Sequence, residues 1–468
     1  MDAEERGHRW RALVLCLVAG GMCLLDVSIV NVALPSIRTG LHAGESEIQW
    51  VVAGYSVAFG MALVPSGRLG DARSRRLVFL VGVAVFTASS AACGAAVNPL
   101  WLAVARVVQG VGGGLITPQV SGFIQTMFRG EERGRAFGLF GATIGISTAL
   151  GPLLGGVLIQ LGGVSEGWRW VFYVNVPIGI ALVALARRWL PKAEGSRSAS
   201  LDPVGVLLFA AATLLVLLPV VGGSQGQALS SRPWWLVGAA AGVLVAFFVW
   251  EVHSTRQQRQ TLVDLSLRRI PSYVFGLSVG TFYFAGFTAI FLILTLYLQE
   301  GLGYSALQAG ATQTSFAVGS AASAFLAGRL VNRFGRRLVV VGLVVICGSL
   351  VALDQVVPHV HSHVGLALAP LLLCAGFGGG MVISPNVTLS LAEVDPARAG
   401  AGGGLLQTAQ RVGSAIGVAV VLAQFFESLS STRGDFAQAF SDALHTTIVL
   451  LLVALVLAVV DEVRRQRT

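Results

Sequence analysis

LDVSIVNVALP, residues Leu25–Pro35, places a single carboxylate, Asp26, inside an apolar run that begins near Ala12. The run is long enough to cross a bilayer as a helix. An ionised aspartate near the middle of such a helix costs roughly 2.5 to 3.5 kcal/mol. We therefore expect Asp26 to be neutral, paired with a cation or in contact with water. Two interpretations remain open: Asp26 is a structural partner for a cation, or it is a titrating group that takes up and releases a proton.

The composition indicates a polytopic membrane protein. Apolar residues make up 54% of the 468 positions, charged residues only 12%, and the mean hydropathy is +0.76. A soluble domain of this size would not tolerate so apolar a surface. Glycine and proline are frequent inside the long apolar runs, which indicates helices and not barrel strands. We expect fourteen spans, at residues 11–34, 48–68, 77–97, 100–127, 136–160, 169–189, 203–222, 234–252, 272–298, 306–330, 338–357, 364–391, 400–426 and 443–461.

The formal charge of +9 is explained by topology. Residues at the very ends of spans are counted here with the adjoining loop. Of the 32 lysine and arginine residues, 26 then fall at the termini and in the loops that share a side with them, four fall in the opposite loops and two lie deep within spans. By the positive-inside rule, both termini are expected in the cytoplasm. The basic charge therefore gives no reason to expect a nucleic-acid partner. Only one of these residues is lysine, which is typical of a GC-rich bacterial genome, so we expect the cytoplasmic (inner) membrane of a bacterium.

The first third of the chain is repeated in the last third. GRLGDARSRR at Gly67–Arg76 is echoed by GRLVNRFGRR at Gly328–Arg337, and GGGLITPQ at Gly112–Gln119 by GGGMVISPN at Gly378–Asn386. Both echoes connect the same pair of elements, so the last six spans are expected to repeat the first six. Alternating access requires two such bundles with a substrate path between them. We expect an N-terminal six-helix bundle at 1–190, two inserted helices with linkers at 191–269, and a C-terminal six-helix bundle at 270–468.

Three predicted spans carry a polar stripe along one helical face, because residues three, four and seven positions apart share a face. One of them, span 364–391, aligns Asn386, Ser390 and Glu393. Such stripes are expected to face a cavity or each other, and simple adhesion between helices remains an alternative. The stripe of span 100–127 consists of Arg106, Gln109, Gly110, Gly113 and Thr117, and that of span 400–426 of Gln407, Gln410, Arg411 and Ser414.

With these motifs in view, the chain resembles the fourteen-spanner drug:proton antiporters of the major facilitator superfamily over its full length. LDVSIVNVALP is similar to the first-helix signature of that family. Gly67–Arg76 resembles its inner loop, although Ala72 and Ser74 stand where an arginine and a glycine are usual. The remaining matches are RVVQG at Arg106–Gly110 in the fourth span, GPLLGG at Gly151–Gly156 in the fifth, and WRWVFYVNVPIG at residues 168–179 entering the sixth.

The resemblance implies an all-α membrane protein with the major facilitator fold, in which fourteen transmembrane helices form two six-helix bundles plus two inserted helices. It implies a role of Arg106 in proton transfer, and together with the position of Asp26 inside the first span this leads us to expect proton coupling through Asp26 and Arg106. It also implies that Asp71 pairs with basic residues and a helix end across the two halves when the cytoplasmic side is closed. The implied cytoplasmic gate motif is Gly67, Arg68, Asp71, Arg75 and Arg76, and the implied antiporter motif is Gly145, Gly151, Pro152, Gly155 and Gly156. Independently, the proline and glycines predict a bend or close helix packing.

The function expected from this resemblance is proton-coupled efflux of amphipathic or cationic drugs and antibiotics by alternating access. Protonation of Asp26 and release of that proton would bias outward-open and inward-open states, with Arg106 shifting the balance. Substrate and proton would compete. The alternative is symport of a nutrient or metabolite on the same scaffold, against which the glycine-proline motif argues. No enzyme is expected, because the sequence shows no nucleophile-base pair, nucleotide loop or soluble domain.

The partners expected are an amphipathic small molecule and the lipid bilayer, with the chain acting as a monomer. No cofactor is expected besides the coupling proton, and no metal. The histidines His359, His361 and His363 alternate in an outer loop, which leaves a metal site as a weak alternative to an ordinary polar loop. The other acids that could titrate are Glu393, Asp354 and Glu300, and the candidates for the substrate cavity are Asn31, Trp50, Tyr55, Gln109, Tyr283, Asn386, Gln410 and Arg411.

Overall fold

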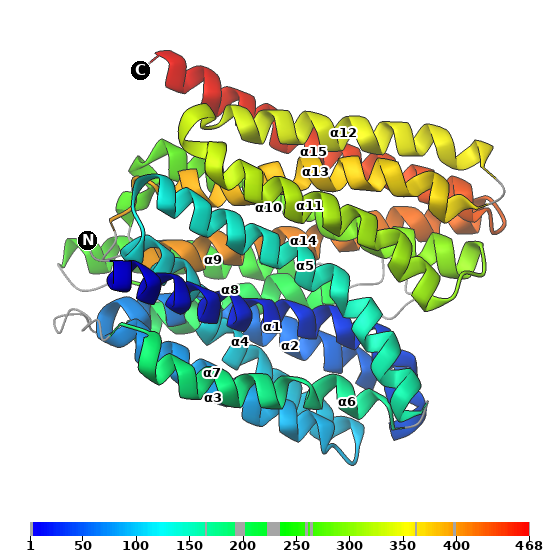
Figure 1. The fold of residues 1–468 in the computed structure, drawn as a ribbon, viewed down its shortest axis with the longest axis horizontal. Helices are drawn as coiled ribbons and strands as arrows, with labels where there is room; N and C mark the ends of the chain where they lie inside the picture. The colour runs from blue at the N-terminus through cyan, green and yellow to red at the C-terminus, as the bar shows by residue number, and fades with distance from the viewer. Residues whose placement is uncertain are drawn as a thin grey trace.

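The computed structural model describes residues 3–163, 166–191, 202–221, 235–257, 261–262, 265–360, 363–395 and 399–467. Parts of the two predicted linkers, as well as His361, lie outside these residues. The described chain is entirely helical apart from its turns (Figure 1). Its helices are α1 (Ala3–Leu41), α2 (Glu45–Leu69), α3 (Arg75–Gly94), α4 (Pro99–Met127), α5 (Gly130–Gly162), α6 (Trp168–Tyr173), α7 (Asn175–Trp189), α8 (Pro203–Val221), α9 (Trp235–Arg256), α10 (Pro271–Leu296), α11 (Ala306–Phe334), α12 (Arg337–Val356), α13 (Val364–Leu391), α14 (Ala399–Ser431) and α15 (Phe436–Arg467).

Each of the fourteen predicted spans overlaps a helix, and only span 169–189 is divided, between α6 and α7. In the described residues, eleven helical stretches are long and apolar enough to cross a membrane. One of them, Trp50–Gly94, covers most of α2 and the whole of α3. The helix α5 qualifies as a pair bent by 41° between Gly130–Thr148 and Leu153–Gly162, and α8 is a shorter apolar helix. The all-α membrane class is therefore confirmed.

The sharp reversal between α2 and α3 is made by the first copy of the repeated motif. A π-helical turn covers Gly70–Ser74. Ser74 itself has an extended backbone, with φ −159° and ψ 116°, and its hydroxyl accepts a hydrogen bond from the backbone N–H of Leu77 at 3.3 Å. A serine is a favoured cap for the unsatisfied N–H groups at a helix start. Ser74 therefore ends one span and caps the next without the glycine that is usual in the family.

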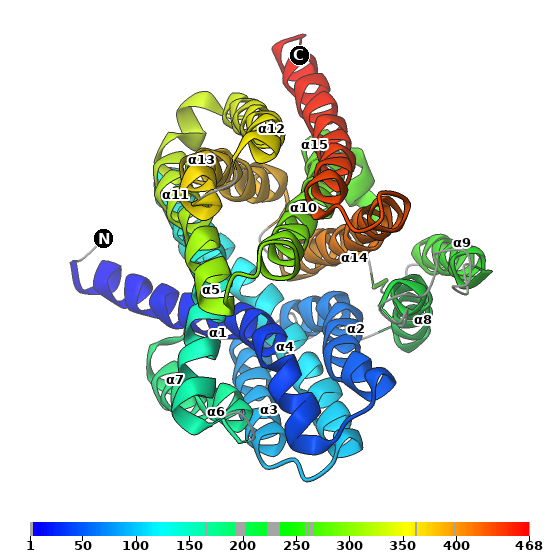
Figure 2. The same ribbon diagram turned by 90° about the vertical axis from the view of Figure 1, so that its right-hand side faces the viewer.

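The helices are arranged in two groups, with a pair beside them. Figure 2 shows α1–α4 with α6 and α7 on one side and α10–α15 on the other, while α5 reaches between the two groups. The helix α8 lies beside α2 and α14, and α9 packs on α8. Phe209 of α8 and Phe247 of α9 pack into one apolar cluster with Val64 of α2. The inserted pair therefore covers the outside of the line where α2 meets α14.

Both chain termini lie at the same end of the helices (Figure 1). The turn Gly70–Ser74 lies at this end too, because α1 runs away from it and α2 returns to it. We call it the motif end. Here the two groups meet backbone to backbone. A methyl group added at Gly67 of α2 would overlap the carbonyl oxygen of Gly400 in α14, and one added at Gly328 of α11 would lie 2.6 Å from that of Gly134 in α5. Glycine permits this close approach because it has no side chain.

Candidate functional site

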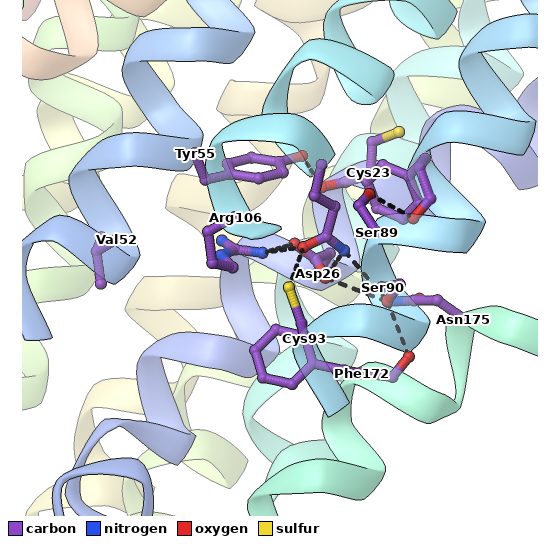
Figure 3. Close-up of polar contacts among 12 residues, drawn as sticks. Cys23, Asp26, Val52, Tyr55, Ser89, Ser90, Cys93, Arg106, Phe172 and Asn175 are labelled. Atoms are coloured by element: carbon purple, nitrogen blue, oxygen red, sulfur yellow. Dashed lines mark hydrogen bonds and ion pairs between the residues drawn. The ribbon is translucent and has the colours of Figure 1, made fainter. Parts of the chain in front are cut away.

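The carboxylate of Asp26 lies in the interior of the N-terminal group, paired with a guanidinium. Both side chains are buried: Asp26 is 0% accessible and Arg106 is 2% accessible. The Nη1 atom of Arg106 lies 2.5 Å from Oδ2 of Asp26 (Figure 3). A buried charge is tolerated only when it is paired and hydrogen-bonded. From the sequence, Asp26 was expected to be neutral, paired with a cation or in contact with water. In this structure it is paired with Arg106.

Two side-chain amides complete the environment of the carboxylate. Gln109 donates from Nε2 to Oδ1 of Asp26 at 2.9 Å, and Asn175 donates from Nδ2 to the same oxygen at 3.1 Å. Both amides also donate to the hydroxyl of Ser90, at 3.2 and 3.1 Å. The Ser90 hydroxyl donates in turn to the backbone oxygen of Phe172 at 2.9 Å (Figure 3). The carboxylate thus accepts three donors, which stabilise its charged form.

The three donors to Asp26 come from two helices of the N-terminal group, α4 and α7. Arg106 and Gln109 lie one turn apart on α4, and Nη1 of Arg106 also donates to Oε1 of Gln109 at 2.7 Å. Asn175 is the first residue of α7, directly after the break that separates it from α6. Ser90 lies on α3. The hydrogen bonds around Asp26 therefore join α1, α3, α4 and α7.

An aromatic ring covers the guanidinium on the side of α2. The Cζ atom of Arg106 lies 4.2 Å from the ring centroid of Tyr55, and its Nε donates to the backbone oxygen of Val51 at 3.2 Å. The Tyr55 hydroxyl donates to the backbone oxygen of Cys23 at 3.2 Å. Tyr55 is itself buried. Cation–π contact and hydrogen bonds therefore hold Arg106 in place in a site from which water is largely excluded.

This arrangement can hold a carboxylate charged in an apolar interior, and it can respond to a proton. Protonation of Asp26 would remove the charge that balances Arg106 and convert an acceptor into a donor. The three donors would then face a neutral carboxyl group, which is a weaker hydrogen-bond acceptor. Weaker hydrogen bonds would favour a rearrangement of the helices that carry these residues. The roles of Asp26 and Arg106 in proton coupling remain predictions.

Sequence reasoning missed Asn175 and Ser90. Asn175 lies inside WRWVFYVNVPIG, whose similarity to the family was noted as a whole. An amide in an otherwise apolar span was the available signal, because such a residue needs a buried partner. Ser90 offered no comparable signal, since serine in a helix can bond to its own backbone.

The gate motif forms the second polar site, at the motif end. Asp71 accepts hydrogen bonds from Arg75, whose Nη2 and Nε lie 2.8 and 3.0 Å from its Oδ1. It also accepts from the backbone N–H groups of Gly400, at 3.2 Å, and Ala401, at 2.8 Å. These N–H groups lie in the first described turn of α14, and an anion at the start of a helix is stabilised by its dipole. Asp71 thus joins the two groups of helices.

The other gate residues surround this contact. Arg75 donates from Nη1 to the backbone oxygen of Gly122 in α4 at 3.3 Å. Arg76 donates to the backbone oxygen of Arg187 at the end of α7. Arg68 lies half-buried in the last turn of α2. Their roles in gating remain predictions.

The glycines of the predicted antiporter motif differ in how closely neighbouring helices pack against them. A methyl group at Gly151 would overlap Cβ of Ser28, and one at Gly155 would lie 3.1 Å from Cγ1 of Ile29, so α5 packs tightly on α1 at both positions. Gly145 faces Ser320 of α11, with a methyl group expected 3.2 Å from its hydroxyl. A methyl group at Gly156 would meet nothing within 4 Å. The 41° bend of α5 falls between Thr148 and Leu153, where Gly151 and Pro152 lie.

The candidates for the substrate cavity do not form one group. Tyr55 and Gln109 belong to the Asp26 cluster, as described above. Asn31 is exposed and Trp50 is 49% accessible. Tyr283 is buried and stacks on Phe287, with ring centroids 5.4 Å apart. Gln410 lies half-buried against Gly280 of α10, and half-buried Arg411 lies over the ring of Phe59.

Asn386 belongs to a third buried polar cluster, which sequence reasoning did not identify. Arg336 is fully buried and pairs with Asp461 of α15, Nε to Oδ2 at 2.5 Å. Its Nη1 donates to Oδ1 of Asn386 at 2.5 Å, and Nδ2 of Asn386 donates to the backbone oxygen of Gly276 at 2.8 Å. The signal was the repeat itself, because Arg336 corresponds to Arg75. Both ends of the Asn386 amide are therefore engaged within the C-terminal group.

The other three acids that the sequence suggested could titrate lie away from the Asp26 cluster. Glu393 is exposed and lies 3.6 Å from Nη2 of Arg465. Asp354 lies 2.9 Å from Nε2 of His445, and Glu300 is exposed. Of the acids named from the sequence as possible carriers of the proton, Asp26 is the most deeply buried, with 0% of its surface accessible against 8% for Asp354.

Comparison with known proteins agrees with this architecture. The family model of the Major Facilitator Superfamily matches residues 16–418. The chain is 38% identical over 429 residues to the probable actinorhodin transporter of Streptomyces coelicolor, covering 91% of this chain and 74% of that protein. It is 33% identical over 428 residues to the multidrug resistance protein Stp of Mycobacterium tuberculosis, covering 90% and 78%. The solved structure of the human organic anion transporter MFSD10 superposes with a TM-score of 0.68, covering 96% and 99%; its 16% identity supports the fold alone.

Proposed function

This chain belongs to the major facilitator superfamily of membrane transporters, and from that premise we propose that it exports amphipathic organic compounds of the drug and antibiotic type in exchange for protons. The observation that carries the proposal is the buried Asp26 carboxylate with its three side-chain donors. A buried ion pair often contributes no more stability than apolar residues of similar volume would. Stability alone therefore does not explain a charge at this position, whereas a role in transport does.

The proposed cycle alternates between two states. Asp71 on the N–H groups of α14 holds the motif end closed, and this end faces the cytoplasm together with both termini. Protonation of Asp26 releases Arg106 from its charge partner, which loosens the packing of the N-terminal bundle and favours the other state. The two six-helix bundles, residues 1–190 and 270–468, move relative to each other in this proposal, and a single chain suffices for it.

The proton gradient is large enough to drive such export. A potential of about 100 mV acting on one inward charge and a gradient of about one pH unit together supply roughly 3.7 kcal/mol. That free energy corresponds to accumulation of a neutral compound by on the order of 500-fold.

The test compares Asp26→Asn with the wild type in sealed inverted membrane vesicles. An acid-inside gradient is generated, and the proton efflux that follows addition of a candidate compound is recorded with a pH-sensitive dye. Asp26→Asn keeps the shape of the side chain but cannot titrate, so compound-driven proton movement should be lost. Glu393→Gln, which removes an exposed acid, is the matched control and should behave as the wild type. Proton movement at the wild-type rate in Asp26→Asn would assign the carrier to another group, and compound and proton moving in the same direction would indicate symport.

A further inference from the structure

Among the residues that the structure describes, Arg411 has no charge partner, unlike the buried arginines Arg106 and Arg336. It lies on α14, half-buried, with its Cζ atom 4.6 Å from the ring centroid of Phe59 on α2. By contrast, Arg106 pairs with Asp26 and Arg336 pairs with Asp461. In the part of the chain that the structure describes, no carboxylate or carbonyl oxygen accepts a hydrogen bond from the Arg411 guanidinium. A guanidinium has five N–H donors and retains its charge, so these donors are available to another molecule.

The position of Arg411 places it between the two bundles. Further along α14 towards the motif end, Gly404 fits tightly against α2, and a methyl group there would lie 2.7 Å from the carbonyl oxygen of Leu63. Arg411 lies seven residues beyond Gly404, which is about 10 Å along the helix. Phe59, which its guanidinium covers, lies one turn beyond Leu63 on α2. Arg411 therefore lies directly beyond the closed part of the seam, towards the middle of the molecule.

Two aromatic rings separate Arg411 from the proton site. Phe59 and Tyr55 lie one turn apart on α2, with ring centroids 5.8 Å apart. Arg106 covers the Tyr55 ring and Arg411 covers the Phe59 ring. One end of this pair of rings therefore bears a guanidinium balanced by Asp26, and the other end bears a guanidinium without a balancing charge. The net charge of this region is positive.

A second unsatisfied polar group lies on the same helical face. The hydroxyl oxygen of Thr408 is buried and has no hydrogen-bond partner among the described residues. Thr408 precedes Arg411 by three positions, so the two side chains project from neighbouring points on one face of α14. A buried hydroxyl without a partner costs free energy, which a bound acceptor would recover.

We propose that Arg411 is the anion-binding residue of the substrate site, and that the exported compound is a flat ring system bearing a carboxylate or an ionised phenol. The acidic group would bind the guanidinium, Thr408 would donate to it, and the ring system would pack on Phe59 and Tyr55. This proposal rests on the proposed function and departs from the expectation of a cationic cargo. A cationic compound would be repelled by the unbalanced guanidinium.

An anionic cargo changes how proton and substrate oppose each other. Protonation of Asp26 makes the region more positive, which would attract an anion and not expel it. Exchange then depends on the two conformations and not on competition of charges at one site. The rings of Tyr55 and Phe59 provide the physical link, since each contacts one of the two guanidinium groups.

The test uses two dyes that share the xanthene ring system and differ in charge: fluorescein, an anion at mildly alkaline pH, and tetramethylrhodamine methyl ester, a cation. Binding of each dye to the purified full-length protein in detergent is measured by fluorescence anisotropy, with protein-free micelles subtracted. The wild type should bind fluorescein roughly ten-fold more tightly than the cation, because charge-assisted hydrogen bonds are about twice as strong as neutral ones. Arg411→Gln should abolish this preference and leave binding of the cation unweakened.

Two further variants separate charge from folding. Arg411→Lys keeps the charge and should retain most of the preference, whereas Thr408→Val should weaken fluorescein binding by a few-fold. Arg329→Gln is the matched control, because Arg329 also covers a phenylalanine ring, that of Phe325 at 4.2 Å, but is exposed on α11. Equal binding of the two dyes by the wild type, preference for the cation, or an unchanged preference in Arg411→Gln would each overturn the proposal. The binding measurements need no proton gradient, so they test the anion site independently of proton exchange. The anion site can be overturned while Asp26-dependent proton exchange is confirmed, and proton exchange can be overturned while the anion site is confirmed.

Discussion

The carboxylate of Asp71 accepts a 2.8 Å hydrogen bond from the backbone N–H of Ala401, 330 positions further along the chain. At the corresponding position of the second repeat, Asn332 is exposed on the last turns of α11. The two seams between the bundles are thus alike in their glycine contacts, Gly67 with Gly400 and Gly328 with Gly134, but only the first is crossed by this aspartate. The repeated glycines let the two bundles approach closely at both seams. At the first seam, Asp71 adds charge-assisted hydrogen bonds from α14, and we call this contact the latch.

Loss of this latch should favour opening of the motif end. Asp71→Asn removes the charge that two N–H groups and Arg75 stabilise, and hydrogen bonds to charged groups contribute about 1.5 to 3 kcal/mol each. The measurement is the rate at which a water-soluble maleimide labels Ser121→Cys in a cysteine-free background, because Ser121 is buried against α14 at Gly403. We expect labelling to be at least roughly ten-fold faster in Asp71→Asn. Glu131→Gln, which breaks an exposed pair with Arg135, is the control, and equal rates in all three proteins would contradict the latch.

The glycines of the two seams should be intolerant of a methyl group, and Gly156 should tolerate one. Gly67→Ala and Gly328→Ala place Cβ against a carbonyl oxygen of the opposite bundle and should slow transport severely. Gly156→Ala meets nothing within 4 Å and should be neutral, or stabilising by about 0.5 to 1 kcal/mol, because alanine is the better helix former. Initial transport rates in vesicles at matched protein levels check both statements. A strong defect in Gly156→Ala alongside normal Gly67→Ala would show that packing at the motif end does not limit the cycle.

Asn175 should support proton exchange by holding the Asp26 carboxylate in place. Asn175→Leu removes one hydrogen-bond donor from Asp26 and one from the Ser90 hydroxyl. A hydrogen bond contributes about 1 kcal/mol, so compound-driven proton exchange should slow by roughly five-fold. Initial exchange rates in vesicles at matched protein levels provide the measurement. Ser89→Ala is the control, since the Ser89 hydroxyl donates to backbone oxygens of its own helix, and an equal loss of rate there would remove the assignment from Asn175.

The Arg336–Asp461 pair should serve stability and not coupling. Asp461→Asn leaves the fully buried Arg336 without its counter-charge and should destabilise the protein by roughly 3 to 5 kcal/mol. Glu462→Gln, which affects the exposed partner Arg337, should cost less than about 1 kcal/mol. Thermal unfolding in detergent compares the two. Protein of Asp461→Asn that survives purification should still exchange protons, and loss of coupling at normal stability would place Asp461 in the proton path.

Transport of an anionic dye should carry current. Exchange of one inward proton for one outward monovalent anion moves two positive charges inward, whereas exchange for a monovalent cation moves none. In vesicles with the pH gradient collapsed, an imposed potential should therefore drive wild-type transport of the anionic dye. A potassium gradient with valinomycin sets the potential, and a rate independent of its sign would contradict this prediction.

The sequence by itself determined the fold class and the approximate positions of the helices, and it contains the two copies of the repeated motif. Apolar runs about as long as a bilayer is thick must be helices, because every backbone polar group has to be satisfied within lipid. The family motifs likewise indicated membership of the superfamily, which the comparisons confirm. The pairing of Asp26 could be anticipated, because a charge inside a span needs a partner, and Arg106 was the natural choice.

Only the tertiary structure decided which polar residues share a site. Asn175 joins Asp26 across 149 positions, and Asn386 joins Arg336. Arg411 lies over the ring of Phe59 and has no carboxylate partner among the residues that the structure describes. Helical periodicity gives the face on which a side chain lies but not the helix that this face meets. That depends on how glycines such as Gly67 and Gly328 let distant helices approach, which is a property of the packed bundles and not of any single span.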